Sequence, residues 1–304
     1  MLSLKPWRTE ALVRLALGVA VCVFMGVLGL SLLRLKSPGV TVRVPVFAAV
    51  VIAGFLALAT ALAATRKPWQ LEISRARLML FVAMLYVGLA LVGVAQKLTH
   101  AAAGDVTQWQ MVLASLSFQG AALVLIGGFL REHQLGWAEG FGFRNRPVRA
   151  LALGLLATVA LLPVAWLLQM GVAALLSWFD IEAESQAAVR VLRDAPGWLD
   201  RVPLGLVAIV IAPPAEEMLF RGLLYPTVKR AGFPRLALWG TTFLFAAIHW
   251  NLPSFPSLVL LALVLTWLYE KTDNLLAPIA AHSLFNALNF VALHLYEQLP
   301  EHLR

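Results

Sequence analysis

The sequence predicts an all-α membrane protein, a polytopic bundle of about eight to nine transmembrane helices around an intramembrane polar cavity. Hydrophobic residues make up 61% of the 304 residues and charged residues only 13%, a balance that soluble globular domains do not reach. Apolar runs of about 20 residues, the helical length that crosses a roughly 30 Å hydrocarbon core, recur from one end of the chain to the other. We therefore expect an integral membrane protein with no soluble domain.

The net charge of +8 does not indicate nucleic-acid binding. The basic residues fall in short connections between apolar runs, which is the pattern of positive-inside topology and of contact with anionic lipid headgroups. We therefore expect membrane lipids as partners and no nucleic acid. The distribution of basic connections favours a plasma (inner) membrane location with a cytoplasmic N-terminus. The single cysteine, Cys22, excludes an intramolecular disulfide and a cysteine-based metal cluster.

Residues 1–149 are expected to form an N-terminal set of about four spans. Their apolar runs cover about 11–33, 44–64, 78–95 and 109–130. The first run is longer than the apolar stretch of a signal peptide and lacks a following cleavage site, so we expect it to remain as a membrane anchor. The connection 131–149 is rich in glycine and aromatic residues, which is typical of an interfacial turn with Trp and Phe at headgroup level.

Residues 150–304 are expected to form a second membrane domain. Its apolar runs cover about 150–179, 202–228, 236–250, 257–269 and 275–296. Pro163 lies inside the first of them, so we expect a kinked or tilted helix there. Between the first two runs, residues 180–201 alternate charged and apolar positions, which predicts a short amphipathic helix on the membrane surface. This helix is either a plain connector or a lid over a site in the membrane.

Two adjacent carboxylates and an arginine lie in the otherwise apolar run 202–228. A charge near the bilayer centre costs about 3 kcal/mol or more, so such residues usually have a function. Glu217 and Arg221 are four residues apart and can pair on one helix face, whereas Glu216 is rotated by about 100° from Glu217. One carboxylate can thus be held ionised while the other keeps a labile proton, as general acid–base catalysis requires.

The dipeptide Pro213-Pro214 directly precedes this pair. Proline lacks a backbone donor and disfavours α geometry before it, so we expect the helix to break and to restart at the carboxylates. At membrane depth such a break is tolerated only inside protein or along a water-filled cavity. Water near Glu216 is therefore expected.

Two later apolar runs supply imidazoles. His249 ends the run 236–250, and His282 lies in the run 275–296, with Asn286 and Asn289 at i+4 and i+7 on the same helix face. Taken singly, an intramembrane His or Asn is more often a hydrogen-bonded packing residue than a catalyst. Together with the acidic pair, these residues indicate a catalytic site.

In this order, these residues resemble the CPBP family of intramembrane proteases, also called the ABI family. The family includes the type II CAAX prenyl endopeptidases and bacterial immunity and bacteriocin-processing proteins. The resemblance covers about residues 204–289 and rests on the patterns Glu-Glu-x-x-x-Arg, Phe-x-x-x-His and His-x-x-x-Asn. The matching residues are Glu216, Glu217, Arg221, Phe245, His249, His282 and Asn286.

The resemblance implies that residues 150–304 are a catalytic membrane core that hydrolyses a peptide bond of a membrane-associated or lipidated protein or peptide. Glu216 and His249 would activate the attacking water, and Arg221 would orient Glu217. The remaining two residues, His282 and Asn286, would bind or stabilise the developing oxyanion.

Metal dependence stays open at this stage. Glu216, His249 and His282 could hold Zn²⁺ in an open site, but the HExxH helix that would indicate one strongly is absent. Two other functional classes also remain. A non-enzymatic scaffold or bacteriocin-immunity-type protein would keep the motifs for packing, and a transporter would use charged residues and a broken helix as an ion pathway.

Overall fold

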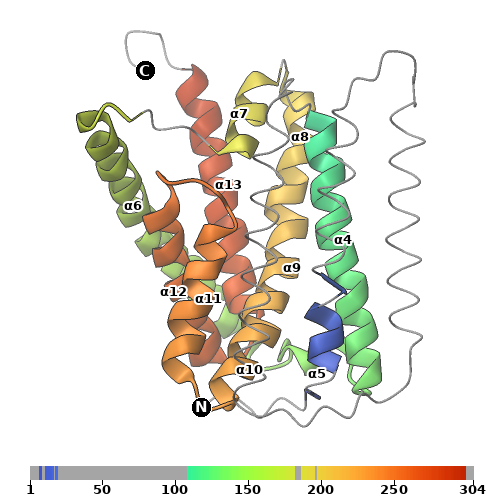
Figure 1. Cartoon of the computed structure of the whole chain (residues 1–304). Helices are drawn as coiled ribbons and strands as arrows, with labels where there is room; N and C mark the ends of the chain where they lie inside the picture. The colour runs from blue at the N-terminus through green and yellow to red at the C-terminus, as the bar shows by residue number, and fades with distance from the viewer. Residues whose placement is uncertain are drawn as a thin grey trace. The chain divides into compact units, whose positions relative to one another are not determined.

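The computed structural model describes residues 7–8, 11–16, 18–19, 108–181, 186–195 and 197–298. All regular secondary structure in these ranges is helical (Figure 1). The chain divides into two compact units, one formed by Lys5–Trp137 and one that contains Ala138–Arg304. The predicted spans 11–33, 44–64 and 78–95 lie largely or wholly outside the described residues.

The first unit contains α4 (Gln108–Glu132), whose 25 residues cover the predicted span 109–130. The end of α4 is tied to the beginning of the chain. Arg14 pairs with Glu132, and the rings of Trp7 and Phe129 pack with centroids 5.1 Å apart. The beginning of the chain, including the start of the predicted first span, therefore packs on the end of α4.

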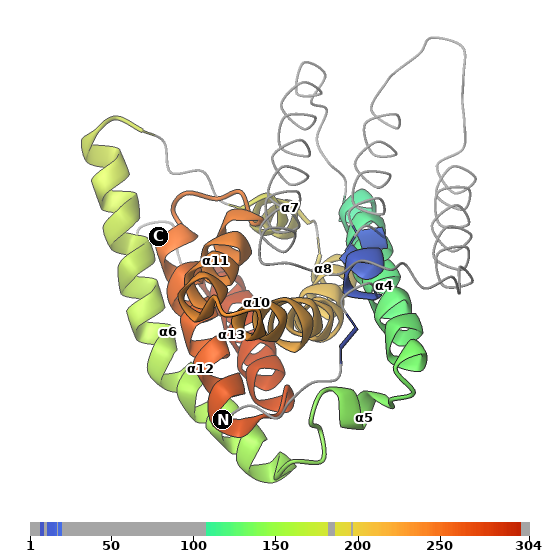
Figure 2. The same ribbon diagram turned by 60° about the horizontal axis from the view of Figure 1, so that its bottom comes forward.

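The second unit contains the helices that follow α4 in the chain. They are α5 (Trp137–Gly140), which begins at the boundary, α6 (Pro147–Trp178), α7 (Ala187–Asp194), α8 (Trp198–Leu206), η2 (Val207–Ile211), α9 (Ala212–Glu217), η3 (Met218–Leu224), α10 (Tyr225–Arg230), α11 (Pro234–Ala247), α12 (Phe255–Thr272) and α13 (Leu276–Gln298). The two η segments are π-helical and join α8, α9 and α10 into one helix. α11 and α13 pack against this helix, α12 packs between α11, α13 and α6, and α6 also packs along α13 (Figure 2).

Four helices of the second unit are long and apolar enough to cross a membrane. They cover Pro147–Trp178, Leu199–Arg230, Phe255–Thr272 and Leu276–Tyr296. The predicted span 236–250 forms α11, whose 14 residues rise about 21 Å at about 1.5 Å per residue, less than the hydrocarbon thickness. The protein is therefore a helical integral membrane protein, while the polar cavity and the total of eight to nine spans stay predictions.

α6 packs through a stripe of small and aliphatic residues. Its buried positions recur at helical spacing and comprise Ala150, Gly154, Thr158, Leu161, Leu162 and Ala165. A Cβ atom at Gly154 would lie 2.4 Å from the carbonyl oxygen of Ala277 in α13, so only glycine permits this approach. α6 continues through Pro163 without interruption. Beyond Ala165 it exposes large apolar side chains, as a lipid-facing surface does.

The predicted helix break at Pro213-Pro214 is wrong. The backbone stays in the right-handed helical region, with φ −98° and ψ −45° at Ile211 and φ −66° and ψ −49° at Ala212. A π-turn precedes the prolines, and the Ala212 N–H donates to the carbonyl of Val207. The wider turn redirects the hydrogen bonds that the prolines cannot make, so the helix passes through the pair without a new N-terminus.

The glycine- and aromatic-rich connection also departs from the prediction at Phe141. This ring is fully buried instead of lying at headgroup level. A Cβ atom at Gly222 in η3 would lie 2.7 Å from the Phe141 ring, and the Leu275 N–H donates to the Phe141 carbonyl at 3.1 Å. The connection therefore joins η3 to the start of α13. By contrast, Trp137 is 40% exposed.

The segment 180–201 contains the predicted amphipathic helix as α7. Leu192 is buried, whereas Arg190 and Arg193 are exposed. The helix that carries the acidic pair then begins at Trp198, earlier than the predicted residue 202.

Candidate functional site

Glu217 and Arg221 form a buried ion pair. Glu217 is the last residue of α9, and Arg221 lies one turn later in η3. Nη1 of Arg221 lies 2.8 Å from Oε1 of Glu217, and the two side chains are 1% and 0% exposed. The predicted pairing is therefore present. A buried pair of this kind is tolerated when further hydrogen bonds satisfy its remaining polar atoms.

α12 supplies these further bonds to Arg221, although it contains none of the predicted site residues. Nη2 of Arg221 donates to the carbonyl of Ala262 at 3.1 Å, and Nε donates to Oγ1 of Thr266 at 3.4 Å. Sequence reasoning missed this role of α12. The available signal was Thr266, a polar residue within the apolar run 257–269.

His282 of α13 completes the cluster around Glu217. Its Nδ1 lies 3.0 Å from Oε1 of Glu217, the same oxygen that Arg221 contacts, and the His282 side chain is 4% exposed. Because a carboxylate only accepts when ionised, Nδ1 is the donor in this pair. The contact fixes the orientation of the imidazole. Its Nε2 is left on the opposite side of the ring.

Glu216 has a different environment from its neighbour. It is half-buried, and its Oε2 is shielded from solvent but has no hydrogen-bond partner among the described residues. It lies close enough to Arg221 and His249 for direct electrostatic interaction. Oε2 of Glu217 also lacks a partner there, so the two glutamates differ in that Arg221 and His282 hold Oε1 of Glu217.

His249 lies in the turn that follows α11. Its Nδ1 is 2.7 Å from the carbonyl oxygen of Phe245, one helical turn earlier. A carbonyl can only accept, so Nδ1 of His249 carries a proton in this contact. In the neutral ring, the lone pair is then on Nε2, which can bind a water hydrogen.

Asn286 and Asn289 do not act together, although the sequence places them on one stripe. Nδ2 of Asn286 donates to the carbonyl of Ala208 at 2.8 Å. In a π-turn, residue 213 would supply the donor for Ala208, but Pro213 has no N–H. The Asn286 side chain supplies one instead. Asn289 accepts a hydrogen bond from Trp166 of α6 at 2.9 Å, which makes it a helix-packing residue.

The predicted zinc ligands Glu216, His249 and His282 do not form a metal-binding arrangement. Within the described ranges, no group of three His, Cys, Asp or Glu side chains is placed to hold one ion. Nδ1 of each histidine is bonded to a carbonyl or a carboxylate, so only Nε2 of each ring could bind a metal. These residues do not fit a three-ligand zinc site, and metal dependence itself stays a prediction to be tested.

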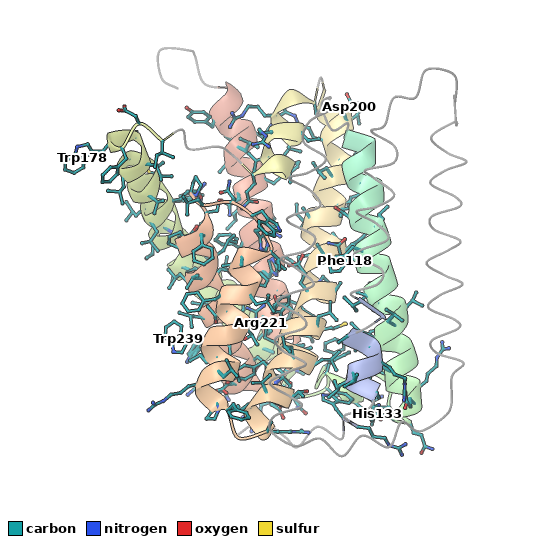
Figure 3. All side chains as sticks on the ribbon, viewed as in Figure 1. Phe118, His133, Trp178, Asp200, Arg221 and Trp239 are labelled. Carbon is teal, nitrogen blue, oxygen red and sulfur yellow. The ribbon has the colours of Figure 1, made fainter. Side chains whose placement is uncertain are left out.

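The predicted site residues therefore come from three helices and one turn of the second unit. Arg221 lies in the interior of this unit (Figure 3). Glu217, Arg221 and His282 are joined by direct bonds, and Glu216 and His249 interact electrostatically beside them. Asn286 lies one turn beyond His282 on α13 and bonds to η2.

Comparison with known proteins yields one family. Residues 198–288 match the family described as type II CAAX prenyl endopeptidase Rce1-like. This match confirms the resemblance predicted for residues 204–289. It begins at α8, ends within α13 and includes all six predicted site residues.

One curated relative also matches. YpbD of Bacillus subtilis (strain 168), described as an uncharacterized protein, is 35% identical over 78 residues. The aligned part is 24% of this chain and 37% of YpbD, so the chain spans well under half the length of this relative. No solved structure gives a significant match.

Proposed function

We propose that this protein is an intramembrane endopeptidase that hydrolyses a peptide bond of a membrane-associated or lipidated protein or peptide. The family match over residues 198–288 supports the reaction class. One observation carries the proposal, namely the unequal treatment of two adjacent carboxylates. Arg221 and His282 both bond Oε1 of Glu217. Oε2 of Glu217 and Oε2 of Glu216 both lack a hydrogen-bond partner within the described part of the chain, so the difference is the two bonds that hold Glu217. Hydrolysis by activated water needs one base that is not held in this way.

In the first step, Glu216 accepts a proton from a water molecule. The water oxygen forms a bond to the carbonyl carbon of the scissile peptide, and the π electrons of the C=O bond move to the oxygen. Nε2 of His249, left unprotonated by the Nδ1 contact to Phe245, accepts the second water hydrogen in a hydrogen bond and orients the nucleophile.

Hydrogen-bond donors are needed to stabilise the negative charge that develops on the substrate oxygen. Nδ1 of His282 is bonded to Glu217, and when the ring carries both protons its Nε2–H can donate to the oxyanion. The second amide hydrogen of Asn286 is a further donor, because the first is used by Ala208. Preorganised donors of this kind lower the barrier most when they are held rigidly before the reaction.

In the second step, the tetrahedral intermediate collapses. The C–N bond breaks, the nitrogen takes the proton from Glu216, and the products are a carboxylic acid and an amine. Arg221 takes no part in these transfers. It holds Glu217 in place through the buried ion pair.

The test uses the full-length protein in liposomes with two internally quenched peptides. One carries a farnesylated cysteine in a C-terminal CAAX sequence, and the other is the same peptide without the prenyl group. Glu216→Gln and His249→Ala are expected to lower kcat about 100-fold or more, the usual contribution of general acid–base groups. Glu139→Gln is the matched control, because Glu139 is an exposed glutamate outside the predicted site.

Cleavage that persists unchanged in both site variants would refute these roles. For peptide substrates other than the two probes, the membranes of a Glu216→Ala strain are compared with the parent by terminal proteomics. A precursor that accumulates uncleaved supports the proposal. If neither probe is cleaved and no precursor accumulates, the protein is not an endopeptidase, and the scaffold or immunity-type function takes its place. The continuous helix at Pro213 removes the broken-helix feature that favoured a transporter.

A further inference from the structure

Phe245 lies at the centre of the predicted site but has no acid, base or polar group on its side chain. The ring is 0% exposed. Cζ of Arg221 lies 4.7 Å from the ring centroid. The ring centroids of His249 and His282 lie 5.0 and 5.5 Å from that of Phe245. One apolar side chain thus contacts three of the six predicted site residues.

The Phe245 ring contacts a part of the Arg221 guanidinium that makes no hydrogen bond. Glu217, Ala262 and Thr266 contact its nitrogens, whereas the Phe245 ring lies against its central carbon. A cation close to an aromatic face is attracted by the electron density of the ring, and this attraction is strongest where water is excluded. Arg221 is 1% exposed, so this condition is met.

The contacts with the imidazoles have fixed orientations. His282 meets Phe245 at an interplanar angle of 71°, the edge-to-face geometry that aromatic pairs favour. The His249 ring is tilted at 51°, and its Nδ1 is bonded to the carbonyl oxygen of Phe245. The same residue therefore holds His249 through its backbone and packs on His282 through its ring.

We infer that Phe245 is a positioning residue whose ring holds the Arg221 guanidinium by a cation–π contact and thereby fixes Glu217 and His282 for the reaction. The inference rests on the proposed function for its role in turnover, but the contact itself is independent of that function. If Phe245 served packing alone, any side chain that filled the same volume would replace it. If the electron density of the Phe245 ring matters, a ring of the same shape with reduced electron density will not replace it.

Fluorinated phenylalanines separate these two possibilities, because each added fluorine weakens the ring quadrupole with little change in shape. Mono-, di- and trifluorophenylalanine are incorporated at position 245 of the full-length protein, and kcat and KM are measured on the farnesylated peptide. We expect kcat to fall stepwise, about tenfold across the series, with KM unchanged. Phe243 is the matched control, because it lies on the same helix, stacks on Trp239 and has no cation–π contact within the described ranges.

Thermal unfolding in detergent gives a second readout that needs no activity. Fluorination at position 245 is expected to lower Tm stepwise in the otherwise unchanged protein, but not in the Arg221→Met background, where the cation is gone. If Arg221→Met does not fold, the Tm values of the proteins fluorinated at position 245 are compared with those fluorinated at position 243. A stepwise loss at position 245 alone supports the cation–π contact. Fluorination that leaves both kcat and Tm unchanged overturns the inference. A Tm effect without any peptidase activity retains the contact and refutes the proposed function instead.

Discussion

The two adjacent glutamates show how one residue step along a helix changes a side chain's chemistry. Successive helical residues point about 100° apart. Glu217 therefore faces Arg221 and His282, and the two bonds that they make to its Oε1 distinguish it from Glu216. The pattern Glu-Glu-x-x-x-Arg predicts this difference. Arg221 follows Glu217 by four residues and therefore lies on the same helix face, whereas it follows Glu216 by five.

At the residue scale, Thr266 offers a direct test of the guanidinium site. Thr266→Val keeps the side-chain shape but removes the oxygen that accepts from Nε of Arg221. The buried N–H is then left without an acceptor, which we expect to lower the free energy of unfolding by about 1 kcal/mol and to reduce kcat. Denaturation in detergent and peptide turnover measure the two effects. Thr266→Ser retains the hydroxyl and should behave like the parent. Equal losses in Val and Ser variants would contradict the role of this oxygen.

Metal removal is the second test at this scale. Because no three-residue ligand group is present in the described ranges, we expect dialysis against a strong zinc chelator to leave peptide cleavage unchanged. The measurement is initial rate together with the metal content of the purified protein. Activity that is lost on chelation and restored by Zn²⁺ would require a different arrangement of Glu216, His249 and His282.

At the scale of the element, the π-turn before Pro213 explains why a helix with two consecutive prolines does not break. Proline removes the donors that would bond the preceding turn, and the wider turn and the Asn286 side chain compensate. Asn286 therefore has a structural role besides its predicted role at the oxyanion. The two roles use different hydrogens of the same amide.

A compensating pair of substitutions separates these roles. Asn286→Ala leaves the Ala208 carbonyl without its side-chain donor, which we expect to cost about 1–3 kcal/mol of unfolding free energy. Adding Pro213→Ala restores a backbone N–H, so Tm should recover in the double variant while kcat stays low. If kcat recovers together with Tm, Asn286 serves the fold alone. If neither recovers, the account of Pro213 is wrong.

At the scale of the whole molecule, the second unit gathers basic residues at one end. Its helix ends meet there through the Asn274 bond to the Asn145 carbonyl and the Lys229 pair with Glu270. The basic residues on these helix ends and their connections are Arg144, Arg146, Arg149, Lys229, Arg230, Arg235 and Lys271. The positive-inside rule predicts that this end faces the cytoplasm.

Thiol labelling tests this orientation. In a Cys22→Ser background, Arg144→Cys is expected to react with an impermeant maleimide only in inside-out vesicles, and Asp180→Cys only in right-side-out vesicles or intact cells. Arg144 and Asp180 flank α6, a single crossing by length and composition, so they should lie on opposite sides. The reverse labelling pattern would place the N-terminus outside, contrary to the prediction.

The sequence by itself determined the properties that depend on neighbours within a few turns. Hydropathy located the four long apolar helices of the second unit, and four-residue spacing predicted the Glu217–Arg221 pair. The ordered motifs identified the family over residues 198–288. Each of these follows from local composition or helix geometry, so no tertiary information was required.

Only the tertiary structure decided how the site is held. The Arg221 bond to the Ala262 carbonyl spans 41 residues of sequence, the His282 contact with Glu217 spans 65, and the Asn286 bond to Ala208 spans 78. From hydropathy alone, α12 is only an apolar span. From sequence alone, the Pro213-Pro214 pair predicts a helix break. The apolar span is present as α12, but its packing also makes it a partner of Arg221, and the predicted break does not occur. Buried polar groups take whichever partner packing brings within hydrogen-bonding distance.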